Sequence, residues 1–141
     1  MDSLLTLVED LIKDGNYKKT SYEDNRPDGD YLCSIEAIDL KTSESGTQWF
    51  DLKGRIIDGD YMEQEMHCKY FLTEKTLKRS IGDIMNLIDI CGYEPAIEMF
   101  SDFEVLNDNL QVLLNNTIII NKNTSKKGGV FYTAKAVKEE N

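Results

Sequence analysis

The stretch Thr47–Leu72, TQWFDLKGRIIDGDYMEQEMHCKYFL, predicts two antiparallel strands joined by a tight turn. The strands are Thr47–Asp58 and Gln64–Leu72, and Asp58-Gly59-Asp60 between them is a hairpin signal. Successive strand residues point to opposite faces of a sheet, so one face is expected to enter the core with Phe50, Leu52 and Ile56. The opposite face then carries Trp49, Lys53 and Arg55, followed on the next strand by His67, Lys69 and Phe71.

Upstream of this pair, Tyr31–Lys41 predicts a first strand, and Thr42–Gly46 is a turn by composition. The alternation of the strand is blurred. One face would carry Tyr31, Cys33, Ile35 and Ala37, whereas the other would carry Leu32, Ile38 and Leu40. A long strand that bends and serves both halves of a barrel would give this pattern.

Downstream, the clearest helix of the chain is expected to begin at a Thr73 cap and to stop at Gly92. Its apolar stripe consists of Leu77, Ile81, Ile84, Met85, Ile88 and Cys91. A longer insertion, Tyr93–Asn116, follows the helix, and we expect Phe100, Phe103 and Leu106 to anchor it. Its end, from Leu110 to Leu114, fits either a short helix or the lead into the next strand.

The last two strands are predicted at Thr117–Asn121 and Val130–Val137, with the loop Asn123–Gly129 between them. The order is therefore three strands, one long helix and two strands, which is the order of the five-stranded OB barrel. We predict a mainly β fold: an OB-type barrel over 30–138, with the long helix between strands three and four. Residues 1–29 would form a short N-terminal helix and a linker, and 139–141 a short acidic tip with Glu139 and Glu140.

Composition places the chain among ordinary globular proteins, with 40% hydrophobic and 30% charged residues. No apolar run reaches the roughly 20 residues of a membrane span, and the N-terminus lacks the pattern of a signal peptide, so a cytoplasmic location is expected. Three widely spaced cysteines predict core residues rather than a disulfide framework. One histidine and no zinc-type cysteine pair argue against a metal site, no nucleophile has a neighbouring base, and no cofactor is expected.

Charge is distributed unevenly along the chain. The formal net charge is -10, yet Asn115–Lys138 contains five lysines and no acidic residue. A local basic groove is compatible with overall acidity, because salt screens exposed charges beyond about 8–10 Å.

Several segments resemble a family of small phage-encoded OB-fold proteins that bind single-stranded DNA, formerly a domain of unknown function. The similarity is carried by Asp28-Gly29-Asp30-Tyr31, Lys41–Gly46, Gln48-Trp49-Phe50-Asp51-Leu52, Ile56-Ile57-Asp58-Gly59-Asp60-Tyr61, Asp89-Ile90-Cys91-Gly92 and Lys126-Lys127-Gly128-Gly129. It covers roughly the span 28–137, a single domain. It implies binding of single strands during phage replication or recombination, without catalysis.

Single-strand binders need aromatic faces for stacking and cations for the backbone. On the predicted outer face, Trp49 beside Lys53 and Arg55 fits a stacking platform; alternatively, Trp49 covers a side of the barrel. His67, Lys69 and Phe71 would adjoin this face, unless Phe71 closes the core. Lys126 and Lys127 in the glycine-rich loop would clamp phosphates, or else the loop is a solvated hairpin. The candidate set also includes Lys122, Phe131 and Lys135.

These residues favour sequence-independent binding of single-stranded DNA, with phage replication or recombination proteins as partners and homo-oligomer formation left open. No membrane partner is expected. The alternative is an acidic OB-like adaptor or inhibitor, in the extreme a mimic of DNA, that binds protein and no nucleic acid.

Overall fold

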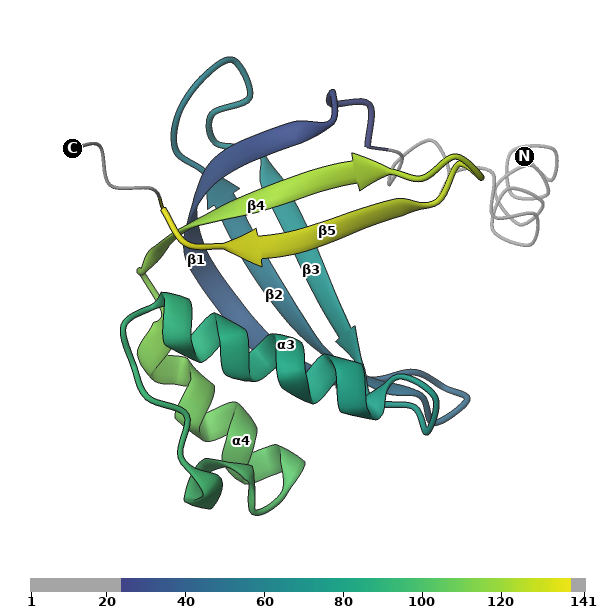
Figure 1. The fold of residues 1–141 in the computed structure, drawn as a ribbon, viewed down its shortest axis with the longest axis vertical. Coiled ribbons are helices and arrows are strands. Elements are labelled where there is room, and N and C mark those ends of the chain that lie inside the picture. Colours follow the sequence, from purple (N-terminus) through teal and green to yellow (C-terminus); the bar gives the residue numbers. More distant parts are fainter. Residues whose placement is uncertain (1–23, 138–141) are drawn as a thin grey trace, which may run out of the picture.

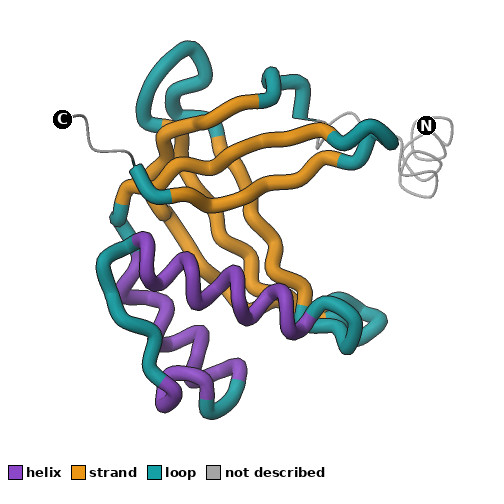
Figure 2. Tube along the Cα trace, viewed as in Figure 1, coloured by secondary structure: helices purple, strands orange, loops and turns teal. Residues whose placement is uncertain are grey.

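The computed structural model describes residues 24–137 as a mainly β fold (Figures 1 and 2). The five strands are β1 (Gly29–Thr42), β2 (Gln48–Ile56), β3 (Glu65–Phe71), β4 (Thr117–Thr124) and β5 (Val130–Lys135). The helices α3 (Leu77–Ile90) and α4 (Phe103–Leu110) and the short 3-10 turns η1 (Ile97–Phe100) and η2 (Gln111–Leu113) all lie between β3 and β4. The predicted mainly β order, with a helix after the third strand and two strands following, is therefore found, but the second helix, α4, was not predicted. The predicted N-terminal helix and acidic tip lie outside the described residues.

The strands form one antiparallel sheet in the order β3-β2-β1-β4-β5. Strand β1 is central and long enough to pair with β4 through its first half and with β2 along its second. Strands β3 and β5 are the two edges, and no ladder joins them among the described strands, so the sheet stays open and the predicted OB-type barrel is not closed. Their Cα atoms nevertheless come within 8 Å of each other, because the sheet curls strongly (Figure 1).

A bulge at Glu36 explains the blurred alternation of β1. Ile35 faces Gly54 on β2, whereas Ala37 faces the preceding residue Lys53, so one extra residue stands between them. A bulge exchanges the two faces of the strand beyond it. Cys33 and Ile35 point into the core before the bulge and Ile38 after it, and the prediction that Ala37 shares the face of Ile35 is wrong.

Curling also needs a residue without a side chain at Gly54. A Cβ at this position would lie 2.7 Å from Ile120 Cδ1 and 3.1 Å from Cys33 Cβ. Both neighbours are completely buried. Glycine in a strand interior marks such a close approach, and here it lets β2 approach β4 across the interior of the sheet.

Helix α3 ends as predicted but begins later. Gly92 has φ +89°, and the Gly92 and Tyr93 amides donate to Asp89 O and Ile88 O at 2.9 and 3.1 Å, which closes the helix. The N-cap is Thr76 instead of Thr73. The buried side of the helix also differs from the predicted stripe: Leu87 is buried with Ile84 and Ile88, whereas Met85 is 43% exposed.

The segment 93–116 resolves into α4 with a short turn on each side, so its end is helical rather than a lead into β4. Asp102 caps α4 by accepting from Val105 N at 2.8 Å. Leu106 is buried, and Phe103 stacks edge-on against Phe50 with the ring centroids 6.3 Å apart. The predicted anchoring of this segment is thus confirmed for both residues.

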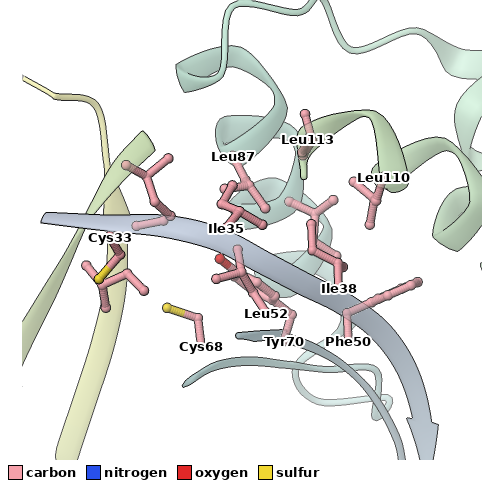
Figure 3. Close-up of a cluster of buried hydrophobic side chains, with 14 of the residues drawn as sticks. Cys33, Ile35, Ile38, Phe50, Leu52, Cys68, Tyr70, Leu87, Leu110 and Leu113 are labelled. Atoms are coloured by element: carbon pink, nitrogen blue, oxygen red, sulfur yellow. The ribbon is translucent and has the colours of Figure 1, made fainter. Parts of the chain in front are cut away.

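The core fills the space between the curled sheet and the helices (Figure 3). Sheet residues such as Ile35, Ile38 and Leu52 meet Leu87 of α3 and Leu113 from the segment after α4 (Figure 3). The three cysteines are free thiols: Cys33 and Cys68 are buried and Cys91 is half-buried. Among the described residues, none of the helices has the length and apolar character needed to cross a membrane.

Residues 24–28 form a strap that precedes β1 and ties the two edges together. Arg26 pairs with Asp24 at 2.8 Å, and Arg26 Nη1 donates to the Glu65 carbonyl at the start of β3 at 2.9 Å. The Tyr132 hydroxyl of β5 donates to Asp24 Oδ2 at 2.7 Å. Asp28 accepts from the backbone and side chain of Thr124 at the end of β4 at 3.0 and 2.8 Å. The strap therefore bridges β3 and β5 where no ladder does.

Candidate nucleic-acid interface

The outer face of β2 and β3 unites the aromatic and basic residues predicted for it. The register places Trp49 opposite Phe71 and Lys53 opposite His67, with Asp51 opposite Lys69 between them. Phe50, Leu52 and Ile56 point the other way and are completely buried. The predicted division of this strand pair into a core face and an outer face is confirmed.

Trp49 and Phe71 form an aromatic pair at one end of this face. Their ring centroids are 5.9 Å apart and the rings are inclined by 37°. Phe71 is 40% exposed, so it does not close the core, and Trp49 is half-buried. The indole Nε1 is buried without a hydrogen-bond partner. Trp49 thus combines the two predicted alternatives: it covers part of the sheet and leaves part of its surface open.

Lys41 of β1 belongs to the same face and was missed by sequence reasoning. It stands opposite Trp49 in the β1–β2 ladder, and its side chain is 48% exposed. Counted from Cys33 and Ile35, Lys41 falls on the core face; the bulge at Glu36 moves it outward. The sequence does contain a sign of this bulge: the apolar residues Cys33 and Ile35 occupy odd-numbered positions, whereas Ile38 occupies an even-numbered one.

Asp51 holds Lys41 and His67 of this face in place. Its buried carboxylate lies 3.1 Å from Lys41 Nζ and 2.9 Å from His67 Nδ1. Burial alone would raise the pKa of Asp51, but the hydrogen bonds from His67 and Lys41 outweigh burial and lower it. Asp51 therefore remains ionised and offsets positive charge on the face.

At the other end of the face, acidic residues neutralise the predicted cations. Arg55 Nη2 donates to Glu36 Oε1 at 2.5 Å, and Arg55 Nη1 lies 3.7 Å from Glu63. Lys53 lies 3.6 Å from Glu65. The hydrogen bond from Arg55 lowers the pKa of Glu36. Lys53 and Arg55 are thus on the predicted face, but their charges are already compensated by residues of the chain.

Lys122 is not available to a ligand, and its inclusion in the predicted interface is wrong. The residue is 5% exposed. Its ammonium donates to the carbonyls of Asp24 and Arg26, the former at 2.8 Å, and lies 3.7 Å from the Asp24 carboxylate. Lys122 is therefore a buried anchor for the strap.

The turn between β4 and β5 projects from one end of the molecule (Figure 1) and exposes Lys126 and Lys127. Neither lysine has an ion-pair partner among the described residues. Hydrogen bonds from Gly128 N to Ser125 O at 2.9 Å and from Ser125 N to Gly129 O at 2.7 Å close the turn. The loop is thus an ordered hairpin that presents two exposed cations.

Beyond this turn, the outward face of β5 carries Phe131 and Lys135, as predicted. Phe131 is 50% exposed, and Lys135 lies 3.6 Å from Asp30. The nearby hollow of about 310 Å³ is lined by Asp30, Asp58 and Asp60. Three carboxylates repel a polyanion, so this part of the surface is unsuited to a phosphate backbone.

The structure therefore separates the candidates into an aromatic end of the β2–β3 face and a basic β4–β5 turn, and it removes Lys122. In the comparison with known proteins, the sequence matches no protein-family model and no curated protein.

Proposed function

We propose that this protein is a non-catalytic OB-type protein that binds single-stranded DNA with little sequence preference, in the cytoplasm, during phage replication or recombination. An OB barrel is five-stranded and only partly closed, and it binds oligonucleotides on the face of strands two and three and in the loops flanking it. A curled sheet with edges β3 and β5 is compatible with that architecture.

The observation that carries the proposal is the Trp49–Phe71 pair. An aromatic side chain that is 40% exposed is free to stack on a base, and stacking tolerates any base because each one has a π-face. The neighbouring Lys41 and Lys69 supply cations of the kind that contact a backbone.

The two ends of the β2–β3 face differ in what they offer a polyanion. Around Trp49 and Phe71 the cations are accompanied by the buried carboxylate of Asp51 and by the exposed Asp39, which lies opposite Asp51 in the β1–β2 ladder. Around Arg55 three glutamates surround two cations. Binding is therefore expected at the aromatic end, with Lys126 and Lys127 of the β4–β5 turn as additional phosphate contacts.

Titration with oligo-dT at low and high salt tests the proposal. Trp49 is the only tryptophan, so its fluorescence reports directly on the aromatic pair. Bound oligonucleotide should quench this fluorescence. Raising the salt from about 50 mM to about 200 mM should weaken binding strongly, because releasing counterions into a more concentrated salt solution is less favourable.

Phe71→Ala should weaken binding by about 1–3 kcal/mol, the usual value of one stacked base, which is about 5- to 150-fold in Kd. Tyr93→Ala is the matched control, since Tyr93 is an aromatic residue of similar exposure, 45%, just after α3. Affinity should be unchanged in the control. If the parent protein binds no oligo-dT at low salt, the proposal is refuted. That result would favour the adaptor alternative, in which the acidic protein binds a basic partner protein.

A further inference from the structure

The first turn of α3 is fixed directly beside the aromatic pair. The carbonyl of Phe71 accepts hydrogen bonds from the Thr76 hydroxyl at 2.8 Å and from the Ser80 hydroxyl at 2.6 Å. The Leu72 amide donates to Gln48 O at 2.9 Å, which ties the start of this connection to β2. In Figure 1 the helix follows the end of β3 after one short turn. The position of the helix start relative to Phe71 is thereby set.

Three cations gather at this helix start: Lys75, Lys78 and Arg79. All are exposed, and none has an ion-pair partner among residues 24–137. Glu74 is the one acidic residue between Leu72 and Arg79. This group therefore differs from Lys53 and Arg55, whose charges are matched by glutamates.

The placement of these cations opposes the electrostatics of the helix. The N-terminus of a helix carries partial positive charge, so cations in the first turn cost stability and acidic residues are normally favoured there. The first turn of α3 has no acidic residue, and Thr76 at the N-cap makes no side-chain capping hydrogen bond because its hydroxyl is directed to Phe71 O. The Leu77 amide already donates to Thr73 O at 2.8 Å, so the positive potential of this region comes from the three cations and the helix dipole, to which an anion is the natural complement.

We propose that Lys78 and Arg79, with Lys75 beside them, bind the phosphates of a single strand whose bases stack on Trp49 and Phe71. The strand then leaves the sheet at the end of β3 and continues over the start of α3, away from the glutamates around Arg55. This inference rests on the proposed function, since it extends the same site by a second, phosphate-binding part on a helix.

Lys78→Gln/Arg79→Gln tests the assignment in the full-length chain by oligo-dT titration across a range of salt concentrations. Two lost phosphate contacts should flatten the slope of log affinity against log salt by up to about 1.4, at about 0.7 per contact, which is up to about 25-fold in affinity over one decade of salt. The quenching of Trp49 at saturation should be unchanged, because the stacked base remains in place. Thermal stability should be equal to or above that of the parent.

The charge-preserving variant Lys78→Arg/Arg79→Lys is the matched control and should retain the parent slope. An unchanged slope in the glutamine variant, with the parent still binding, would overturn the α3 contact and leave the proposed function standing. If the salt slope flattens equally in both double variants, the α3 contact is also overturned, because the shape of the side chains rather than their charge would then be responsible. Failure of the parent to bind oligo-dT would overturn both proposals.

Discussion

Neutralising Asp24 by the substitution Asp24→Asn should destabilise the fold, because this carboxylate holds the strap to both sheet edges. Its side chain is 10% exposed and faces two largely buried cations, Arg26 and Lys122, with Tyr132 as a further donor. Burial alone would raise the pKa of Asp24, but the hydrogen bonds from Arg26 and Tyr132 outweigh burial and lower it from 3.8 to about 2.

The size of the effect follows from this difference. One pKa unit corresponds to about 1.4 kcal/mol, so the ionised form contributes about 2 kcal/mol to the free energy of unfolding at neutral pH. Because the pKa of Asp24 is lower in the folded state, the contribution is complete above the unfolded value of 3.8 and disappears as the pH falls through about 2. At pH 7 the variant should therefore lose about 2 kcal/mol, equivalent to about 5–10 °C in Tm for a domain of this size.

Urea unfolding of parent and variant, followed through Trp49 fluorescence between pH 7 and about pH 2, measures this prediction directly. The difference in unfolding free energy should be constant near neutral pH and should shrink as the parent's Asp24 becomes protonated. Asp60→Asn, at an exposed aspartate in the β2–β3 turn, is the control and should change stability little. A difference that persists undiminished at the acid limit would show that the strap depends on shape and not on the Asp24 charge.

Two further expectations concern packing and the basic turn. Gly54→Ala should destabilise the fold by about 1–3 kcal/mol, because the new Cβ would lie 3.1 Å from the rigid Cβ of Cys33. Gly82→Ala, in α3 with open space around it, is the control and should stabilise the fold by about 0.5–1 kcal/mol. Equal effects of the two variants in thermal melts would contradict the close approach at Gly54. Replacing Lys126–Lys127 by alanine should flatten the salt slope of oligo-dT binding by up to about 1.4 with little change in Tm, whereas an unaltered slope would place the backbone elsewhere.

Much of the sheet could be read from local patterns. Alternation along 47–72 separated Phe50 and Leu52 from Trp49 and Lys53, since strand parity is set by the chain itself. The Gly92 helix end likewise depends on a left-handed conformation that glycine adopts readily. The alternation rule misplaced the residues of β1 beyond Ile35, because the bulge at Glu36 arises from how β1 pairs with β2, and strand pairing is not a local property.

The candidate site was less predictable, because the environment of a charge depends on residues far away in the sequence. Lys122 belongs to the acid-free basic stretch, but Asp24, 98 residues earlier, supplies the carbonyl that binds its ammonium. Arg55 reads as a free cation beside Trp49, yet Glu36 on the neighbouring strand neutralises it.

By itself, the sequence determined the strands, the long helix and the two faces of β2 and β3, because these follow from side-chain periodicity and from the backbone preferences of glycine. The tertiary structure alone decided that the sheet is open, that Lys41 turns outward, that Lys122 is buried, and which of the described cations have acidic partners within 24–137. The reason is physical: burial and charge compensation are produced by contacts between distant segments, and such contacts exist only once the chain has folded.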